Sequence, residues 1–258
     1  MGQSSTYAIW SNAVTAILIT GAAGRIGTLL TRHLAADHRL TLTDTRPIDA
    51  PCGCPTFTGD LADPPFVAHL MGEAAPELVI HLAANADSTS GWDDLREPNV
   101  TGCYNLFAAA AASGCRRVVF ASSVHAVLAY PPQQQVDGAA PPRPADLYGV
   151  TKAFGEALGA YYADCHELSV ICLRLGWVLP RDSPSIDPRN DEFDIVLTYD
   201  DLLRLMDATI AAPETLRFGI FNGVSNNRLS RLDITDARRA LGYAPRDDVF
   251  AMAGITFA

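Results

Sequence analysis

A glycine-rich heptapeptide, GAAGRIG, begins at Gly21 and separates a short apolar run from an amphipathic stretch. The preceding run, AILIT, predicts a buried strand, and the following TLLTRHLAAD predicts a helix that opens within the heptapeptide. Gly21 permits a tight turn, Gly24 lets the backbone approach a pyrophosphate, and Gly27 allows the helix to pack closely on the strand. Unpaired N–H groups at the helix N-terminus favour an anion there. The candidate cofactor-binding residues of this turn are Gly21, Gly24, Arg25, Ile26 and Gly27.

Asp44 ends the next predicted strand, LTLTD, 23 residues after Gly21. A carboxylate at this place accepts hydrogen bonds from both ribose hydroxyls of adenosine and repels a 2′-phosphate. The sequence therefore predicts NAD as the cofactor. NADP stays open as an alternative, because Arg25 and Arg46 could bind the additional phosphate, and Asp44 could instead be a simple turn residue before Pro47.

Short apolar runs alternate with helical stretches along the next part of the chain. Strands are expected at 78–83, 117–121 and 168–173, and helices at 66–72, 102–113 and 152–164. Val- and Ile-rich strands separated by helices predict a Rossmann-type α/β fold, with a doubly wound, mostly parallel sheet covered on both faces.

The sequence changes character after Trp177. A Pro- and Asp-rich stretch at 179–193 precedes a predicted helix at 199–212, a strand at 217–221 and a short helix around 234–241. We expect an N-terminal extension at 1–15, a dinucleotide-binding core with the catalytic residues at 16–178, and a small C-terminal substrate cap at 179–258. The cap is too short to be a domain of its own and is expected to belong to the same structural domain.

The composition argues against several classes of binding partner. The 258 residues carry a formal net charge of −10, a field that repels nucleic-acid backbones and anionic lipid surfaces. Six cysteines without a C-x2-C pair or disulfide-type spacing favour a reducing, cytoplasmic location. No metal site is expected, because the two thiolates of Cys52 and Cys54 cannot complete a zinc shell. Residues 1–15 lack the pattern of a signal peptide or a membrane span.

A tyrosine and a lysine four residues apart, Tyr148 and Lys152, open a predicted helix, and this spacing places both side chains on one helix face. Tyrosine is a poor base at neutral pH, but a neighbouring ammonium and a positive nicotinamide ring favour its phenolate form. Ser123, at the carboxyl end of its predicted strand, would donate to a substrate oxygen beside Tyr148. We therefore predict Ser123, Tyr148 and Lys152 as catalytic residues, with Tyr148 and Lys152 also contacting the cofactor. The alternative is a surface tyrosine and a solvated lysine.

An ordered set of motifs resembles the extended short-chain dehydrogenase/reductase superfamily, also called the NAD-dependent epimerase/dehydratase family. These motifs are GAAGRIG, Asp44, Gly59-Asp60-Leu61, His81-Leu-Ala-Ala84, Asn99-Val-x-Gly-x-x-Asn105, Ala121-Ser-Ser123 and Tyr148-Gly-Val-Thr-Lys152. The resemblance implies further cofactor-binding residues: Asp60, Leu61, Leu82, Ala83, Ala84 and Asn99. Of these, Asp60 would contact the adenine, and Asn99 would help to order the central helix. It also implies a homodimer formed through the helices at 102–113 and 152–164.

A narrower resemblance, carried by FASSVHA, DLYGVTKAFGE, RLG and YDD, is to the uronate dehydrogenase branch of this family. That branch oxidises the anomeric hydroxyl of a pyranose to a lactone with NAD. The short C-terminal region also favours a small substrate over a nucleotide sugar. Two positions depart from the branch, because Val124 stands where it carries Asn and Trp177 where it carries Ser. Both changes replace a polar substrate contact with an apolar one, which makes uronate itself doubtful.

The residues expected to bind the substrate include the two that depart from the branch, Val124 and Trp177. The full set is Asp87, Ser88, Ser123, Val124, His125, Trp177, Arg181 and Arg189. Trp177 could stack on a sugar face or pack in the core, and His125 could bind substrate or serve a structural role. Arg181 and Arg189 could clamp an anionic group or lie exposed among aspartates.

The sequence thus predicts an NAD-dependent oxidoreductase that oxidises a hydroxyl, the anomeric one, of a monosaccharide, uronate or related small sugar acid to a lactone or ketone. Two alternatives stay open. The first is a sugar epimerase or dehydratase that keeps NAD bound, although Val124 and His125 replace the acidic residues that dehydratases carry after the catalytic serine or threonine. The second is a protein that senses NAD without catalysis, a class that often loses the Tyr/Lys pair.

Overall fold

The computed structural model describes residues 14–50 and 53–255. The expected N-terminal extension falls outside this range except for its last two residues, and Cys52 also lies outside the described residues.

Seven strands form one sheet in which all neighbours are parallel. In spatial order they are β3 (Thr56–Thr58), β2 (Arg39–Asp44), β1 (Ala16–Thr20), β4 (Leu78–His81), β5 (Arg117–Ser123), β6 (Ser169–Leu175) and β9 (Phe218–Gly223). The order reverses between β1 and β4, as it does in a doubly wound Rossmann sheet. The predicted fold class is therefore confirmed, and the parallel arrangement brings the carboxyl ends of all seven strands to one edge.

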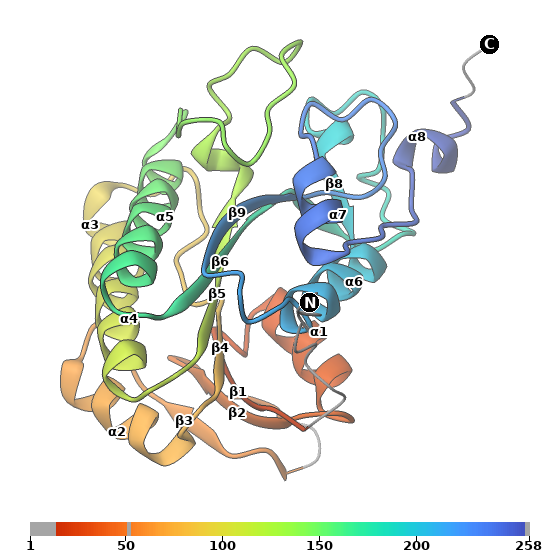
Figure 1. Cartoon of the computed structure of the whole chain (residues 1–258). Helices are drawn as coiled ribbons and strands as arrows, with labels where there is room; N and C mark the ends of the chain where they lie inside the picture. The colour runs from red at the N-terminus through yellow and green to blue at the C-terminus, as the bar shows by residue number, and fades with distance from the viewer. Residues whose placement is uncertain (1–13, 51–52, 256–258) are drawn as a thin grey trace, which may run out of the picture.

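Two layers of helices cover the sheet (Figure 1). One face carries α1 (Arg25–Leu34), α6 (Tyr199–Ile210) and α7 (Thr235–Leu241), and the other carries α2 (Pro64–Ala74), α3 (Trp92–Leu95), the π-helical turn η2 (Arg96–Thr101), α4 (Gly102–Ala112) and α5 (Leu147–Cys165). Alternation along β1 divides the core accordingly, since Ile17 and Ile19 pack in the cluster of the first face and Leu18 in that of the second. Within the described residues, no helix has both the length and the apolar character that crossing a bilayer requires.

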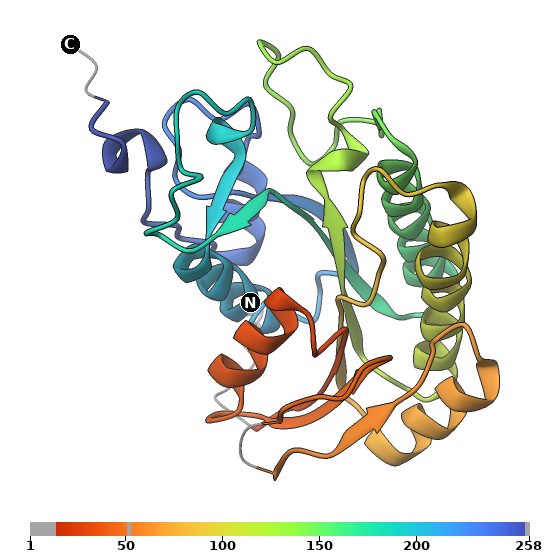
Figure 2. The same ribbon diagram turned by 180° about the vertical axis from the view of Figure 1, so that it is seen from behind.

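The C-terminal segment contributes to the core as well as to the cap. β9 extends the sheet beside β6, and α6 packs against α1, so residues 199–223 belong to the main layers. The remaining part holds a parallel pair, β7 (Trp177–Leu179) and β8 (Val196–Thr198), the short turn η4 (Phe193–Ile195) and α8 (Val249–Met252). The expected boundary after residue 178 therefore falls within β7. Figure 2 shows this part and the loop after β5 rising on the same edge of the sheet.

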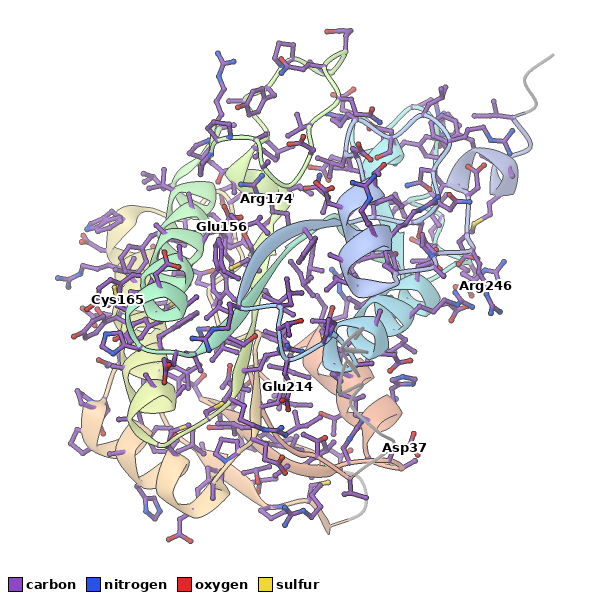
Figure 3. All side chains as sticks on the ribbon, viewed as in Figure 1. Asp37, Glu156, Cys165, Arg174, Glu214 and Arg246 are labelled. Atoms are coloured by element: carbon purple, nitrogen blue, oxygen red, sulfur yellow. The ribbon has the colours of Figure 1, made fainter. Side chains whose placement is uncertain are left out.

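A buried carboxylate joins three elements at that edge. Glu156 of α5 forms a two-pronged ion pair with Arg174 of β6, in which Nε and Nη2 each lie 2.8 Å from a carboxylate oxygen. Ser122 of β5 donates a 2.6 Å hydrogen bond to Glu156 Oε1. Arg174 is 0% exposed, and its guanidinium also donates to the carbonyl of Ala140 in the loop above. Figure 3 shows the two labelled side chains next to each other between helix and sheet.

The first prediction concerns this ion pair. Glu156→Ala leaves the Arg174 guanidinium buried without its carboxylate, so the free energy of unfolding should fall by about 3–5 kcal/mol in urea denaturation. Glu214→Ala is the control, because it removes a carboxylate from an exposed pair with Arg116 and should cost less than about 1 kcal/mol. Equal losses in the two variants would contradict a special role for the buried pair.

The second prediction concerns His81, the last residue of β4. Its Nδ1 lies 2.8 Å from the Thr20 hydroxyl, and burial, with a smaller contribution from the charge of Lys152, lowers its pKa from 6.5 to about 3. The unfolded state therefore binds one proton more than the folded state between these two values. The free energy of unfolding should consequently decrease as the pH falls through that window, by up to about 1.4 kcal/mol per pH unit from this residue.

The measurement is denaturant unfolding of the native protein and of His81→Asn at several pH values between 6.5 and 4. The variant should show the weaker pH dependence, because asparagine does not titrate. A slope that is the same in both proteins would contradict a neutral, buried His81.

Candidate cofactor and active site

A cavity of about 620 Å³ opens at the carboxyl ends of the strands. Its wall runs from the turn after β1, past the ends of β2, β4 and β5, to the start of α5 and the C-terminal part of the chain. The cavity thus lies where the strand order reverses, the usual ligand position in an open α/β sheet. Of the residues expected at the site, the wall includes Gly21, Gly24, Arg25, Ile26, Gly27, Asp44, Asp60, Leu61, Leu82, Ala83, Ala84, Ser123, Val124, His125, Tyr148, Lys152 and Trp177.

The glycine turn forms a tight cradle at one end of the cavity. Gly21 has φ +70°, and a Cβ there would lie 2.7 Å from the backbone nitrogen of Ala83. A Cβ on Gly27 would lie 2.3 Å from the carbonyl oxygen of Gly21. Both contacts are too short for any side chain, so glycine is required at these positions. Since α1 begins at Arg25 and no side chain caps it, its first N–H groups are available to an anion in the cavity.

Asp44 is held in one orientation beside this cradle. One carboxylate oxygen accepts the N–H of Ala23 at 3.0 Å, and the other accepts the N–H of Arg46 at 3.0 Å. The residue is only 9% exposed, yet it lines the cavity. These features fit NAD: the turn without room for side chains and the open helix N-terminus fit its pyrophosphate, and the fixed carboxylate fits its adenosine ribose. The Arg46 side chain, with Nε 3.3 Å from Asp44, stands at the same end of the cavity.

Asn99 does not line the cavity, although it was expected among the cofactor-binding residues. It is buried behind the wall, where its Oδ1 accepts the N–H of Asn85 at 2.7 Å and its amide donates to the Asn85 carbonyl at 2.9 Å. The same amide donates to Thr151 of α5 at 3.0 Å. Asn99 therefore fixes the loop after β4 to α5. Asn85 is itself a wall residue, next to the expected Leu82, Ala83 and Ala84 in the same loop, and motif reasoning missed it.

Ser123, Tyr148 and Lys152 meet at the middle of the cavity wall. Ser123 is the last residue of β5, and Tyr148 and Lys152 occupy successive turns at the start of α5. The ammonium of Lys152 donates to the carbonyl of Ala121 at 2.8 Å and lies 5.4 Å from the centre of the Tyr148 ring. Tyr148 is 8% exposed and Lys152 4%, so the positive charge acts on the ring with little solvent between them.

Asp146 connects His125 to this group, a role that sequence reasoning did not assign. One of its oxygens lies 2.6 Å from His125 Nδ1, and the other caps α5 by accepting the N–H of Gly149 at 2.7 Å. The His125 ring meets the Tyr148 ring edge to face, with 5.3 Å between their centres. Asp146 therefore fixes His125 and the N-terminus of α5 with one carboxylate. An Asp two residues before the helix predicted from Tyr148 is the signal that could have indicated this cap.

Four residues expected to bind substrate lie outside the cavity wall. Asp87 is exposed and accepts hydrogen bonds from the backbone and hydroxyl of Thr89, and Ser88 shares its loop. The guanidinium of Arg189 is exposed and binds the Asp187 carboxylate two residues away. Arg181 lies 3.4 Å from Asp247 and 3.7 Å from Asp200. Both arginines are thus paired with aspartates of their own surroundings, which agrees with the second of the two alternatives that the sequence left open.

The chain from the end of β6 onward supplies further wall residues, which join the expected Trp177. Leu175 and Gly176 belong to the RLG motif, whereas no motif indicated Val178, Glu192 and Ile195. Glu192 and Ile195 lie in or next to the Pro- and Asp-rich stretch, where the sequence shows no periodicity.

Comparisons with known proteins agree with this arrangement. The model of the NAD-dependent epimerase/dehydratase family matches residues 17–188. An L-arabinose 1-dehydrogenase (NAD(P)+) of Haloferax volcanii is 34% identical over 90% of this chain and 96% of its own length. An NAD-dependent glucose-6-phosphate dehydrogenase of the same organism is 32% identical over 90% of this chain and 93% of its own.

The crystal structure of uronate dehydrogenase from Agrobacterium tumefaciens superposes with a TM-score of 0.82 at 31% identity, covering 93% of this chain and 87% of that one. The family model and these relatives each span most of the described sheet and the cavity at its edge. The chain therefore belongs to the NAD-dependent epimerase/dehydratase family, as an NAD-dependent oxidoreductase.

Proposed function

We propose that the protein oxidises the anomeric hydroxyl of a monosaccharide or related small sugar acid to a lactone, with NAD as the oxidant. The observation that carries this proposal is that Ser123, Tyr148 and Lys152 share one cavity with the glycine cradle and Asp44. The relatives support the substrate class, because their names describe dehydrogenases of L-arabinose, glucose 6-phosphate and uronate. The cavity volume of about 620 Å³ falls within the usual range of ligand sites.

Three wall residues have separate roles in the proposed oxidation. Ser123 Oγ, which accepts the N–H of His125 at 3.2 Å, keeps its own proton to donate to the substrate oxygen. Tyr148 accepts the hydroxyl proton, and the Lys152 ammonium stands 5.4 Å from the centre of its ring. The bound NAD supplies the acceptor for the hydride that leaves the same carbon. The carbonyl of Ala121 fixes the Lys152 ammonium, so the charge stays under the Tyr148 ring during proton transfer.

The third prediction tests the role of the phenol. Tyr148→Phe keeps the ring but removes the proton acceptor, so kcat for sugar oxidation should fall at least about 100-fold, measured as NADH absorbance. The Kd for NAD+, measured by calorimetry, should change less than about threefold, because the cradle and Asp44 are intact.

Tyr161→Phe is the matched control, since it makes the same change on the exposed face of α5 and should leave kcat unaltered. Full activity of Tyr148→Phe would contradict the proposal. Bound NAD with isomerised or dehydrated product and no net NADH would instead favour the epimerase or dehydratase alternative.

We also propose a homodimer formed through α4 and α5. These helices pack side by side on the outer face of the sheet, and each presents an exposed tyrosine, Tyr104 on α4 and Tyr161 on α5, both 52% exposed. Val150 of α5 is also exposed, at 42%. Large apolar side chains gathered on one helix pair favour burial against a second copy by two-fold symmetry.

The fourth prediction follows from this surface. Light scattering should give the native protein twice the chain mass of 27.6 kDa, and Tyr104→Arg with Tyr161→Arg should give the single-chain mass. Leu229→Arg is the control, because Leu229 is 58% exposed and belongs to neither helix. A native protein of single-chain mass would contradict the dimer.

A further inference from the structure

We infer that the substrate is an uncharged sugar, and that this cavity rejects sugar acids and sugar phosphates. This inference rests on the proposed oxidation and concerns the part of the cavity beyond Ser123 and Tyr148. That part is walled by Val124, which follows Ser123, and by Trp177, Glu192 and Ile195 from the C-terminal segment. An acidic side chain among three apolar ones is the opposite of an anion site.

The basic residues of the cavity wall are engaged elsewhere. Among the described residues four line it: Arg25, Arg46, His125 and Lys152. Arg25 and Arg46 stand at the glycine cradle and Asp44, at the adenosine end. Lys152 donates to the Ala121 carbonyl beside the Tyr148 ring, and His125 is bonded to the Asp146 carboxylate. Among the described wall residues, no arginine or lysine side chain is thus placed at the distal part of a substrate, and the basic side chain next to Val124 is His125, held at Nδ1 by Asp146.

The arginines nearest to this part of the molecule are paired as well. Arg174 binds Glu156, Arg181 lies beside Asp247, and Arg189 binds Asp187. Arg231 donates to both oxygens of Asp194 and to the backbone carbonyl of Asp191. The hydrogen bond to Asp194, with smaller contributions from the charges of Glu192 and Asp191, raises the pKa of Arg231. One guanidinium therefore faces three carboxylates, and the surplus charge beside the cavity is negative.

Glu192 places one of these negative charges on the cavity wall. It is half-buried and lines the cavity, and no described residue donates a hydrogen bond to its side chain. Its oxygens can therefore accept from sugar hydroxyls, which a neutral sugar offers in abundance. The carboxylate of a uronate or the phosphate of a sugar phosphate would meet a like charge there, which is strongly unfavourable in a partly desolvated site.

The apolar side chains next to Glu192 also favour an uncharged sugar. Trp177 and Ile195 offer surface on which the C–H face of a pyranose or pentose ring can stack. Val124 offers no donor that could compensate an anion taken from water. A carboxylate placed against these side chains would lose its hydration without gaining a partner.

The fifth prediction compares each neutral sugar with its own charged derivative. The kcat/KM for NADH formation should be about tenfold or more higher for D-glucose than for D-glucuronate or glucose 6-phosphate. It should likewise be about tenfold or more higher for D-galactose than for D-galacturonate. Equal or better turnover of the charged derivative would overturn the inference and leave the proposed oxidation intact. NAD+ binding without NADH from any of these sugars or from D-xylose would refute the proposed function and, with it, the inference.

Two variants test the cause of the preference. Glu192→Arg should raise the ratio of kcat/KM for D-glucuronate to that for D-glucose by about tenfold or more, and Glu192→Gln should raise it less, because it removes the charge without reversing it. Asp182→Asn is the matched control, since it removes an exposed carboxylate from the same loop without touching the wall. A ratio that both Glu192 variants leave at the native value would overturn the assignment of selectivity to Glu192.

Discussion

One buried carboxylate holds together the three elements on which the candidate active site stands. Glu156 binds Ser122, the neighbour of Ser123 on β5, and it lies one helical turn beyond Lys152 on α5. Its ion-pair partner Arg174 lies on β6, and Trp177 follows three residues later at the start of β7. A shift of any of these elements would separate a buried charge from its partner, which is costly in a low dielectric. The serine, the tyrosine–lysine pair and the tryptophan are therefore positioned by a single polar cluster beneath the cavity floor.

The upper end of α5 is fixed in a complementary way. Asp146 caps the helix at Gly149 and holds His125, which follows Ser123 on the turn after β5. Helix α5 is thus attached to the strand–turn segment at two levels, by Glu156 within the core and by Asp146 at the edge of the cavity. Asn99 adds a third attachment, from Thr151 to the loop after β4. These side chains support the wall without forming its reactive part, and precise placement of catalytic groups depends on such support.

Local features of the sequence were enough to predict the fold and the cofactor, whereas the arrangement of the proposed substrate end depends on contacts between distant residues. The glycine turn and Asp44 follow directly from a strand, a turn and a helix that are adjacent in the chain. By contrast, Arg181 lies beside Asp247, 66 residues further on, and no periodicity in the stretch between them indicates that pair. The strands β3, β7 and β8 have three residues each, too few to show an alternating pattern. Asn99 was expected at the cofactor because its motif is shared with the family, but only the coordinates show which side of the wall its amide faces.

The distribution of charge along the cavity reconciles the binding of an anionic dinucleotide by a chain of net charge −10 with the uncharged substrate that we infer. At the cradle, the open N-terminus of α1 and the side chains of Arg25 and Arg46 provide local positive potential that offsets the overall field. At the other end, Glu192 and its neighbours Asp191 and Asp194 outnumber Arg231. Because charges separated by more than about 10 Å are largely screened at moderate salt, each end acts on the group that lies next to it. The charges at the cradle therefore favour a phosphate, and those at the other end agree with the neutral substrate that we infer.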